Sequence, residues 1–76
     1  MPQVGADAQF AEGSSGPDVR TWQARMVERG WSLGADGIFG PRTDSVVRSF
    51  QAEKGLTVDG VLGARTWDAA WTTPVT

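Results

Sequence analysis

The sequence predicts an all-α fold, a small three-helix bundle whose helices are joined by two copies of one DGxxG turn. Three observations lead to this prediction. Apolar side chains recur at helical spacing in three segments, a glycine stands before the start of each segment, and the stretch DGIFGPRT at 36–43 returns as DGVLGART at 59–66. A domain of 76 residues buries only about 60% of the surface that its unfolded chain exposes. We therefore expect the core to be small and to need its large side chains.

The first helix is predicted over about residues 17–29. Proline is tolerated at the first position of a helix, where its missing N–H would be unpaired anyway, so Pro17 marks the start. Gly30 marks the end, because glycine readily adopts the left-handed conformation that closes a helix. One face carries apolar side chains at helical spacing, namely Val19, Trp22 and Met26. We expect Trp22 to lie in the core.

The same start and stop signals, glycine and proline, predict two further helices. The second opens at Gly40-Pro41, closes at Gly55, and carries an apolar stripe made of Val46, Val47 and Phe50. The third begins near residue 64 or 65 and ends before Pro74, because proline cannot continue a helix. Its apolar residues are Trp67, Ala70 and Trp71. We expect Trp67 in the core and Trp71 either in the core or as a plug at the end of the bundle.

The repeat extends upstream of the two turns. ERGWSL at 28–33 parallels EKGLTV at 53–58, and the first copy holds two extra residues, Gly34-Ala35, before its turn. Asp36 and Asp59 are expected to accept a hydrogen bond from the backbone two residues on, and the glycines after them supply the positive φ of such turns. Each unit therefore runs from the end of one helix through a tight turn into the next helix.

The remaining turn positions have predicted roles as well. Because a small domain needs its large apolar groups, we expect Phe39 and Leu62 to point inward and Ile38 and Val61 to be partly exposed. The hydroxyls of the paired threonines, Thr43 and Thr66, are expected to reach the unpaired backbone groups of the helix starts.

Composition excludes several functional classes. The chain has no histidine and no cysteine, which removes the usual general base, the thiol nucleophile and the commonest metal ligands. We therefore predict no catalytic residue, no metal site and no cofactor. The net charge of −2 and the scattered cations argue against nucleic-acid binding. No apolar run approaches the roughly 20 residues that cross a bilayer, and we identify no signal peptide at the N-terminus.

At this point the sequence resembles a known family. The stretch DGIFGPRTDSVVRSFQAEKGLTVDGVLGARTW at 36–67 is similar to the repeated core of the peptidoglycan-binding domain found at the ends of many bacterial and phage cell-wall hydrolases. GPDVRTWQARMVERG at 16–30 resembles the first helix of that family. Trp22 stands where leucine is usual, and Ala64 replaces the proline of the first copy. We interpret residues 1–9 as a linker, 10–71 as the domain and 72–76 as a tail.

The resemblance implies a binding module without catalytic activity. The expected partners are bacterial peptidoglycan, through its glycan or its stem peptides, and a covalently linked catalytic domain; nucleic acid and membrane are not expected, and the domain is expected to be a monomer. The expected location is the bacterial cell wall outside the cell, or the wall reached from a phage. The alternative is a protein-interaction or prodomain-like module, because the same three-helix fold occurs as a propeptide in some proteases.

We place the candidate ligand-binding residues at the first turn, where the two copies differ most. The set is Trp31, Asp36, Gly37, Ile38 and Arg42. Trp31 would offer an aromatic platform for a sugar ring, and Arg42 could grip a stem-peptide carboxylate in two places. Three structural alternatives remain open: Trp31 seals the bundle, the two aspartates only stabilise the turns, and the arginines that follow the turns only pair with those aspartates.

Overall fold

The computed structural model describes residues 9–74, and this part of the chain forms three helices and no strand. Helix α1 spans Pro17–Glu28, α2 spans Pro41–Glu53 and α3 spans Ala64–Thr72. The all-α prediction is confirmed, and each helix starts where a glycine supplies the N-cap, at positions 16, 40 and 63. Residues 1–8 of the predicted linker and 75–76 of the predicted tail lie outside the described residues. Thr72, the first residue of that tail, is the last residue of α3.

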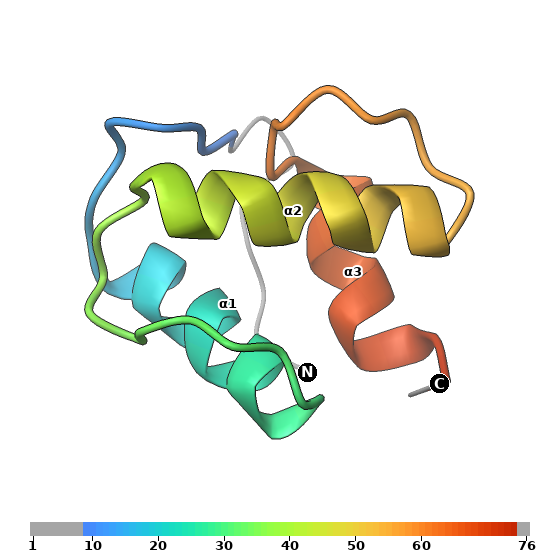
Figure 1. Ribbon diagram of the computed structural model, residues 1–76, viewed down its shortest axis with the longest axis horizontal. Helices are drawn as coiled ribbons and strands as arrows, with labels where there is room; N and C mark the ends of the chain where they lie inside the picture. The colour runs from blue at the N-terminus through green and yellow to red at the C-terminus, as the bar shows by residue number, and fades with distance from the viewer. Residues whose placement is uncertain (1–8, 75–76) are drawn as a thin grey trace.

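The three helices form one bundle in which α2 crosses above α1 and α3 (Figure 1). Helices α1 and α3 pack against each other beneath it. The connection from α1 enters α2 at one end, and the connection to α3 leaves α2 at the other end. The two DG turns therefore lie in separate loops, each held between the end of one helix and the start of the next.

A backbone segment before α1 ties the two turns together. Phe10 N donates a hydrogen bond to Leu62 O over 3.1 Å, and Leu62 N donates one to Phe10 O over 2.7 Å. Gly16 N donates to Gly37 O over 2.9 Å, and Phe39 N donates to Ser14 O over 2.9 Å. We call residues 10–16 the N-terminal strap. It was not predicted, because pairing of backbone groups between distant segments leaves no periodic pattern in the side chains.

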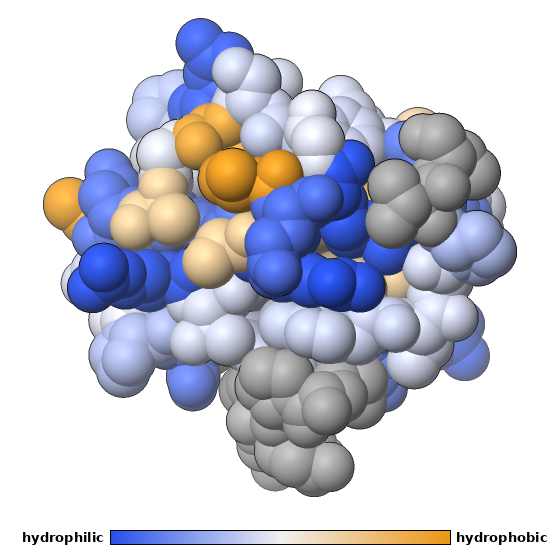
Figure 2. Space-filling model, turned by 90° about the horizontal axis from the view of Figure 1, so that it is seen from below, coloured by the Kyte–Doolittle hydropathy of each residue, from blue (hydrophilic) through white to orange (hydrophobic). Residues whose placement is uncertain are grey.

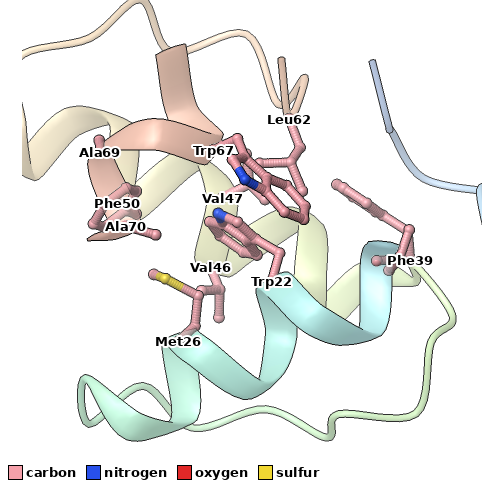
Figure 3. Close-up of a cluster of buried hydrophobic side chains, with 11 residues drawn as sticks. Trp22, Met26, Phe39, Val46, Val47, Phe50, Leu62, Trp67, Ala69 and Ala70 are labelled. Carbon is pink, nitrogen blue, oxygen red and sulfur yellow. The ribbon is translucent and has the colours of Figure 1, made fainter. Parts of the chain in front are cut away.

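The core is built around two tryptophans. Trp22 from α1 and Trp67 from α3 are 0% and 1% exposed, and Phe39 and Leu62 point toward them from the two turns (Figure 3). Helix α2 adds Val46, Val47 and Phe50 to the same cluster. The predicted inward positions are thereby confirmed. Ile38, by contrast, is 59% exposed, as its place next to an inward-pointing residue on an extended segment requires.

The structure contradicts the prediction for the two threonines. Neither α2 nor α3 has a side-chain hydrogen bond at its N-cap. Instead, the hydroxyl of Thr43 accepts a hydrogen bond from Gln23 Nε2 over 2.9 Å, and that of Thr66 accepts one from Gln51 Nε2 over 3.1 Å. Both threonines are buried, so their hydroxyls face the helix behind the turn rather than the free end of their own helix.

The two glutamines hold the turns. Gln23, on α1, accepts from Gly37 N over 2.8 Å and donates to Ile38 O over 2.9 Å. Gln51, on α2, accepts from Gly60 N over 3.1 Å and donates to Val61 O over 2.9 Å. Both side chains are at most 1% exposed. A buried carboxamide is tolerated only when its donors and acceptors are paired, and these two are paired with the turns.

Arg29 fixes the end of α3. Its guanidinium is 7% exposed and donates to the carbonyl oxygens of Ala70, Thr73 and Pro74 at 3.0 Å each. Arg25 donates to the same Ala70 oxygen over 2.8 Å. Burial, with a further effect of the Arg25 charge, lowers the pKa of Arg29. One of the last carbonyls of α3, that of Ala70, and the carbonyls that follow the helix are thus satisfied by Arg25 on α1 and by Arg29 just after it.

Replacing Gln51 by alanine should destabilise the domain. The change leaves the buried N–H of Gly60 and the hydroxyl of Thr66 without this partner, and each buried polar group left unpaired costs about 1–3 kcal/mol. We expect the free energy of unfolding in urea to fall by about 2–4 kcal/mol. Ser49→Ala, on an exposed position of the same helix, should change it by less than about 0.5 kcal/mol. Equal effects of both substitutions would contradict the role given to Gln51.

Candidate functional site

The two turns share one internal construction. Asp36 Oδ1 accepts a hydrogen bond from Ile38 N over 3.0 Å, and Asp59 Oδ1 accepts one from Val61 N over 2.9 Å. The glycines that follow the aspartates have φ of 80° and 72°, which other residues rarely adopt. The turn role predicted for both aspartates is therefore present. Each turn presents its outer surface in a fixed orientation.

The first turn has a depression on the side of α2. Its volume is about 230 Å3. Asp36, Ile38 and Arg42 line it together with Gly34, Gly40, Pro41 and Thr43. Three of the five predicted ligand-binding residues are therefore brought together here.

A second depression lies on the side of α1. It has a volume of about 420 Å3 and is lined by Asp36, Gly37 and Ile38 together with Arg20 and the start of the helix at 15–17. Ile38 lines both depressions, so its exposed side chain forms an apolar ridge shared by the two. Gly37 is buried, and its N–H and C=O are used by Gln23 and by Gly16. Gly37 therefore shapes the turn.

Trp31 is placed apart from this surface and lines neither depression. Its ring meets Phe50 edge to face, with 6.2 Å between ring centroids, and the backbone N–H of Trp31 donates to Met26 O over 3.0 Å. The side chain is half-buried and packs on the core. This arrangement matches the alternative in which Trp31 seals the bundle. Contact between Trp31 and a ligand stays a prediction.

The arginines after the turns are exposed and do not pair with the turn aspartates. Within residues 9–74, the ion pairs are those of Asp44 with Arg48 and of Glu53 with Lys54, each at 3.2 Å. Arg42 and Arg65 take part in neither. The structure therefore does not support the alternative in which Arg42 and Arg65 only pair with the turn aspartates. Both residues are exposed to solvent.

Sequence reasoning missed Arg20, which lines the depression on the side of α1. Arg20 stands three residues before Gln23, as Arg48 stands three residues before Gln51. This recurrence was visible in the repeat. The recurrence could be interpreted only once the two glutamines were known to face the DG turns. A residue three positions before a glutamine lies on the same helix face, so each arginine then also lies beside a DG turn.

The described residues show no site for a metal ion and no membrane segment. Residues 9–74 contain no group of three or more carboxylates that could hold a metal, and none of their helices has the length and hydrophobicity to cross a bilayer. The face that carries α1 is mostly hydrophilic, with only small hydrophobic areas (Figure 2).

Trp31→Ala should lower the stability of the domain, because the substitution removes an aromatic contact with Phe50 and exposes part of the core. We expect the free energy of unfolding to fall by about 1–3 kcal/mol, less than the about 3–5 kcal/mol of a fully buried aromatic residue. Urea titration followed by circular dichroism measures the change. Trp31→Phe, which retains a ring, should recover about half of the loss. An unchanged transition for Trp31→Ala would show that the ring does not support the core.

Asp59 should give the domain an acid-sensitive component of stability. The hydrogen bond from Val61 N, and then that from the Gln51 side chain, lower the pKa of Asp59 below its ordinary value of 3.8. A group with a lowered folded-state pKa contributes stability above its unfolded-state value, and this contribution is lost as the pH falls through the folded-state pKa. Asp59→Asn should therefore melt below the wild type at pH 7. The difference should close below pH 3.8, and a constant difference from pH 7 to pH 2 would contradict this account.

The chain is similar to known proteins along most of its length. A family model described as "Putative peptidoglycan binding domain" matches residues 15–70. The zinc D-Ala-D-Ala carboxypeptidase of Streptomyces albus G is 43% identical over 62 residues, which cover 78% of this chain and 24% of that protein. The spore cortex-lytic enzyme of Bacillus cereus is 46% identical over 55 residues, 71% of this chain and 21% of that enzyme.

Solved structures agree with these matches. A fused zinc-dependent amidase/peptidase and peptidoglycan-binding protein from Clostridium acetobutylicum superposes with a TM-score of 0.83 at 39% identity, over 88% of this chain and 30% of that one. This chain thus spans under a third of these longer relatives. The matched region contains α1, α2, both turns and most of α3. The chain belongs to the peptidoglycan-binding domain family.

Proposed function

We propose that this domain binds peptidoglycan without catalysing a reaction and holds an attached cell-wall hydrolase at its substrate. The observation that carries the proposal is the match to a peptidoglycan-binding domain over residues 15–70, together with the position of the matched region inside longer wall-degrading enzymes. In those proteins the similar region is a minor part of the chain. A separate domain therefore has room to carry the chemistry.

The residues of this domain suit binding better than catalysis. Histidine and cysteine are absent from the sequence, and Asp36 and Asp59 each use a carboxylate oxygen to hold a turn. Glycoside hydrolysis needs two carboxyl groups on either side of the scissile bond, and the depressions at the first turn are open to solvent. No cofactor is required for the proposed role.

We place ligand contacts at the first turn. Ile38 offers an exposed apolar surface that suits the apolar face of a sugar ring or an aliphatic side chain. Arg42 on one side and Arg20 on the other can each donate two parallel hydrogen bonds to a stem-peptide carboxylate. Asp36 and Gly37 set the position of Ile38, and Trp31 supports the loop from below through Phe50.

The proposed partners are therefore peptidoglycan and a covalently linked catalytic domain, with the module acting as a monomer at the cell wall. Single contacts through exposed arginines are weak, since solvent screens them. A polymer that presents many sites raises retention without any new contact, because each rebinding event is effectively intramolecular. Weak individual binding would also let the attached enzyme move along the wall.

Sedimentation with purified sacculi tests this function. The wild-type domain should pellet with insoluble sacculi, and Ile38→Ser with Arg42→Ala should weaken this binding by about tenfold, the change produced by losing about 1.4 kcal/mol of contact. Arg48→Ala is the matched control, because it removes an exposed arginine that lines neither depression of the first turn. Its binding should equal that of the wild type.

Two results would count against the proposal in different ways. If the wild-type domain stays in the supernatant at every salt concentration, peptidoglycan binding is wrong and the protein-interaction or prodomain-like role becomes the better account. If the wild type pellets but the first-turn variant pellets equally, the function stands and the ligand contacts lie elsewhere. Circular dichroism of each variant would confirm that it is folded.

A further inference from the structure

The second turn carries its own depression, which occupies the same place in the repeat as the α2-side depression of the first turn. We call it the second-turn pocket. Six positions of the repeat line both depressions; in the second copy these are Asp59, Val61, Gly63, Ala64, Arg65 and Thr66. The second-turn pocket has a volume of about 410 Å3, against about 230 Å3 for the first. Only the larger one falls in the range of about 300–1,000 Å3 that is usual for small-molecule sites.

The size difference follows from the places where the two copies diverge. The first copy holds the extra residues Gly34-Ala35 just before its turn, and Gly34 lines the smaller depression. The second copy lacks them, and Leu56 and Thr57 line its pocket instead. The second copy also has alanine at 64, where the first has Pro41. A shorter loop and a smaller side chain leave the pocket open.

The opposite side of the second turn is covered. The guanidinium of Arg48 lies 2.6–2.9 Å from the position that a Cβ on Gly60 would take. Asp44 holds it there through an ion pair of 3.2 Å. At the first turn the equivalent arginine, Arg20, lines an open depression. The first turn is therefore open on both sides, whereas the second is open toward its pocket and covered by Arg48 on the other side.

The pocket contains two free charges of opposite sign. Asp59 uses Oδ1 for its hydrogen bonds with Val61 and Gln51, and among the described residues its other oxygen has no hydrogen-bond partner. These hydrogen bonds lower the pKa of Asp59, so the carboxylate is ionised at neutral pH. Arg65 is exposed and forms no ion pair within residues 9–74. Leu56 and Val61 also line the pocket and add apolar surface.

We propose that the second-turn pocket binds an amino-acid head group, an ammonium and a carboxylate on one carbon atom, at the free end of a diamino acid in a stem peptide. Arg65 binds the carboxylate with two hydrogen bonds, and the free oxygen of Asp59 accepts from the ammonium. Leu56 and Val61 contact the aliphatic chain of the diamino acid. This inference rests on the proposed function, because it names which part of peptidoglycan the domain recognises.

The charge arrangement disfavours the other groups that a cell wall offers. A ligand with only a carboxylate would meet the negative charge of Asp59, and one with only an ammonium would meet the positive charge of Arg65. A neutral sugar would leave both charges without a partner. A head group that carries both charges is complementary to the pair.

NMR titration of the ¹⁵N-labelled domain tests the inference with three synthetic tripeptides. The first is L-Ala-γ-D-Glu-meso-diaminopimelate, the second has L-Lys in the last position, and the third has the distal carboxylate of diaminopimelate amidated. We expect the first to shift the amide signals of residues 55–66 and to bind about tenfold or more tightly than the other two. Each of these lacks one part of the head group that the pocket would recognise.

Variants locate the site. Arg65→Ala and Asp59→Asn should each weaken binding of the first tripeptide by about tenfold or more, a change that one charge-assisted hydrogen-bonded contact can produce. Asn keeps an oxygen that can hold the turn, and the amide spectrum reports whether the variant is folded. Asp68→Asn is the control, because Asp68 is an exposed carboxylate of α3 that lies outside the pocket, and this variant should bind as the wild type does.

Failure of this inference is distinguishable from failure of the function. If the wild-type domain pellets with sacculi but the three tripeptides bind equally, or Arg65→Ala binds as well as the wild type, the head-group proposal is overturned and peptidoglycan binding stands. Shifts confined to residues 36–42 would move the head-group site to the first turn and likewise overturn it. If the wild type neither pellets nor responds to any tripeptide, both proposals fail.

Discussion

The structure depends on two buried side-chain carboxamides. Each glutamine sits on the helix before a turn, accepts a hydrogen bond from the turn glycine, and donates to the turn backbone and to the threonine in the first turn of the next helix. One side chain thereby connects two helices and the loop between them. In a domain without disulfides and with a small core, this connection fixes the direction in which each turn presents its outer surface.

The same scaffold, used twice, presents two different surfaces. Equivalent positions of the repeat, Phe39 and Leu62, enter the core in both copies, whereas the loop before the turn and the cover on its far side differ between the copies. An insertion of Gly34-Ala35 narrows one depression, and the position of Arg48 closes another. Two turns built alike can therefore present different chemistry to one polymer, and two weak contacts with the same polymer raise retention.

Helices and core were predictable from the sequence, while the surface was predictable only in part. The Gly-Pro pairs mark the starts of α1 and α2, and apolar residues at helical spacing, Trp22 and Trp67 among them, identify the buried faces. The glutamines were missed because burial of a polar side chain depends on partners from another part of the chain. The N-terminal strap was missed because it pairs through its backbone. Three of the five candidate residues share a depression, but Trp31 packs against Phe50. The sequence could not decide its role, because an aromatic residue after a helix end suits either a core contact or a ligand contact.

The most direct test of the role given to the glutamines is hydrogen exchange at the backbone amides of Gly37 and Gly60. Each amide donates to a glutamine oxygen inside the domain, so its exchange should require nearly global unfolding, with an opening free energy close to that measured by denaturant. The exposed amide of Gly34 in the neighbouring loop provides the comparison. Exchange of Gly37 and Gly60 as fast as that of Gly34 would show that the turns open without the core and would contradict the account.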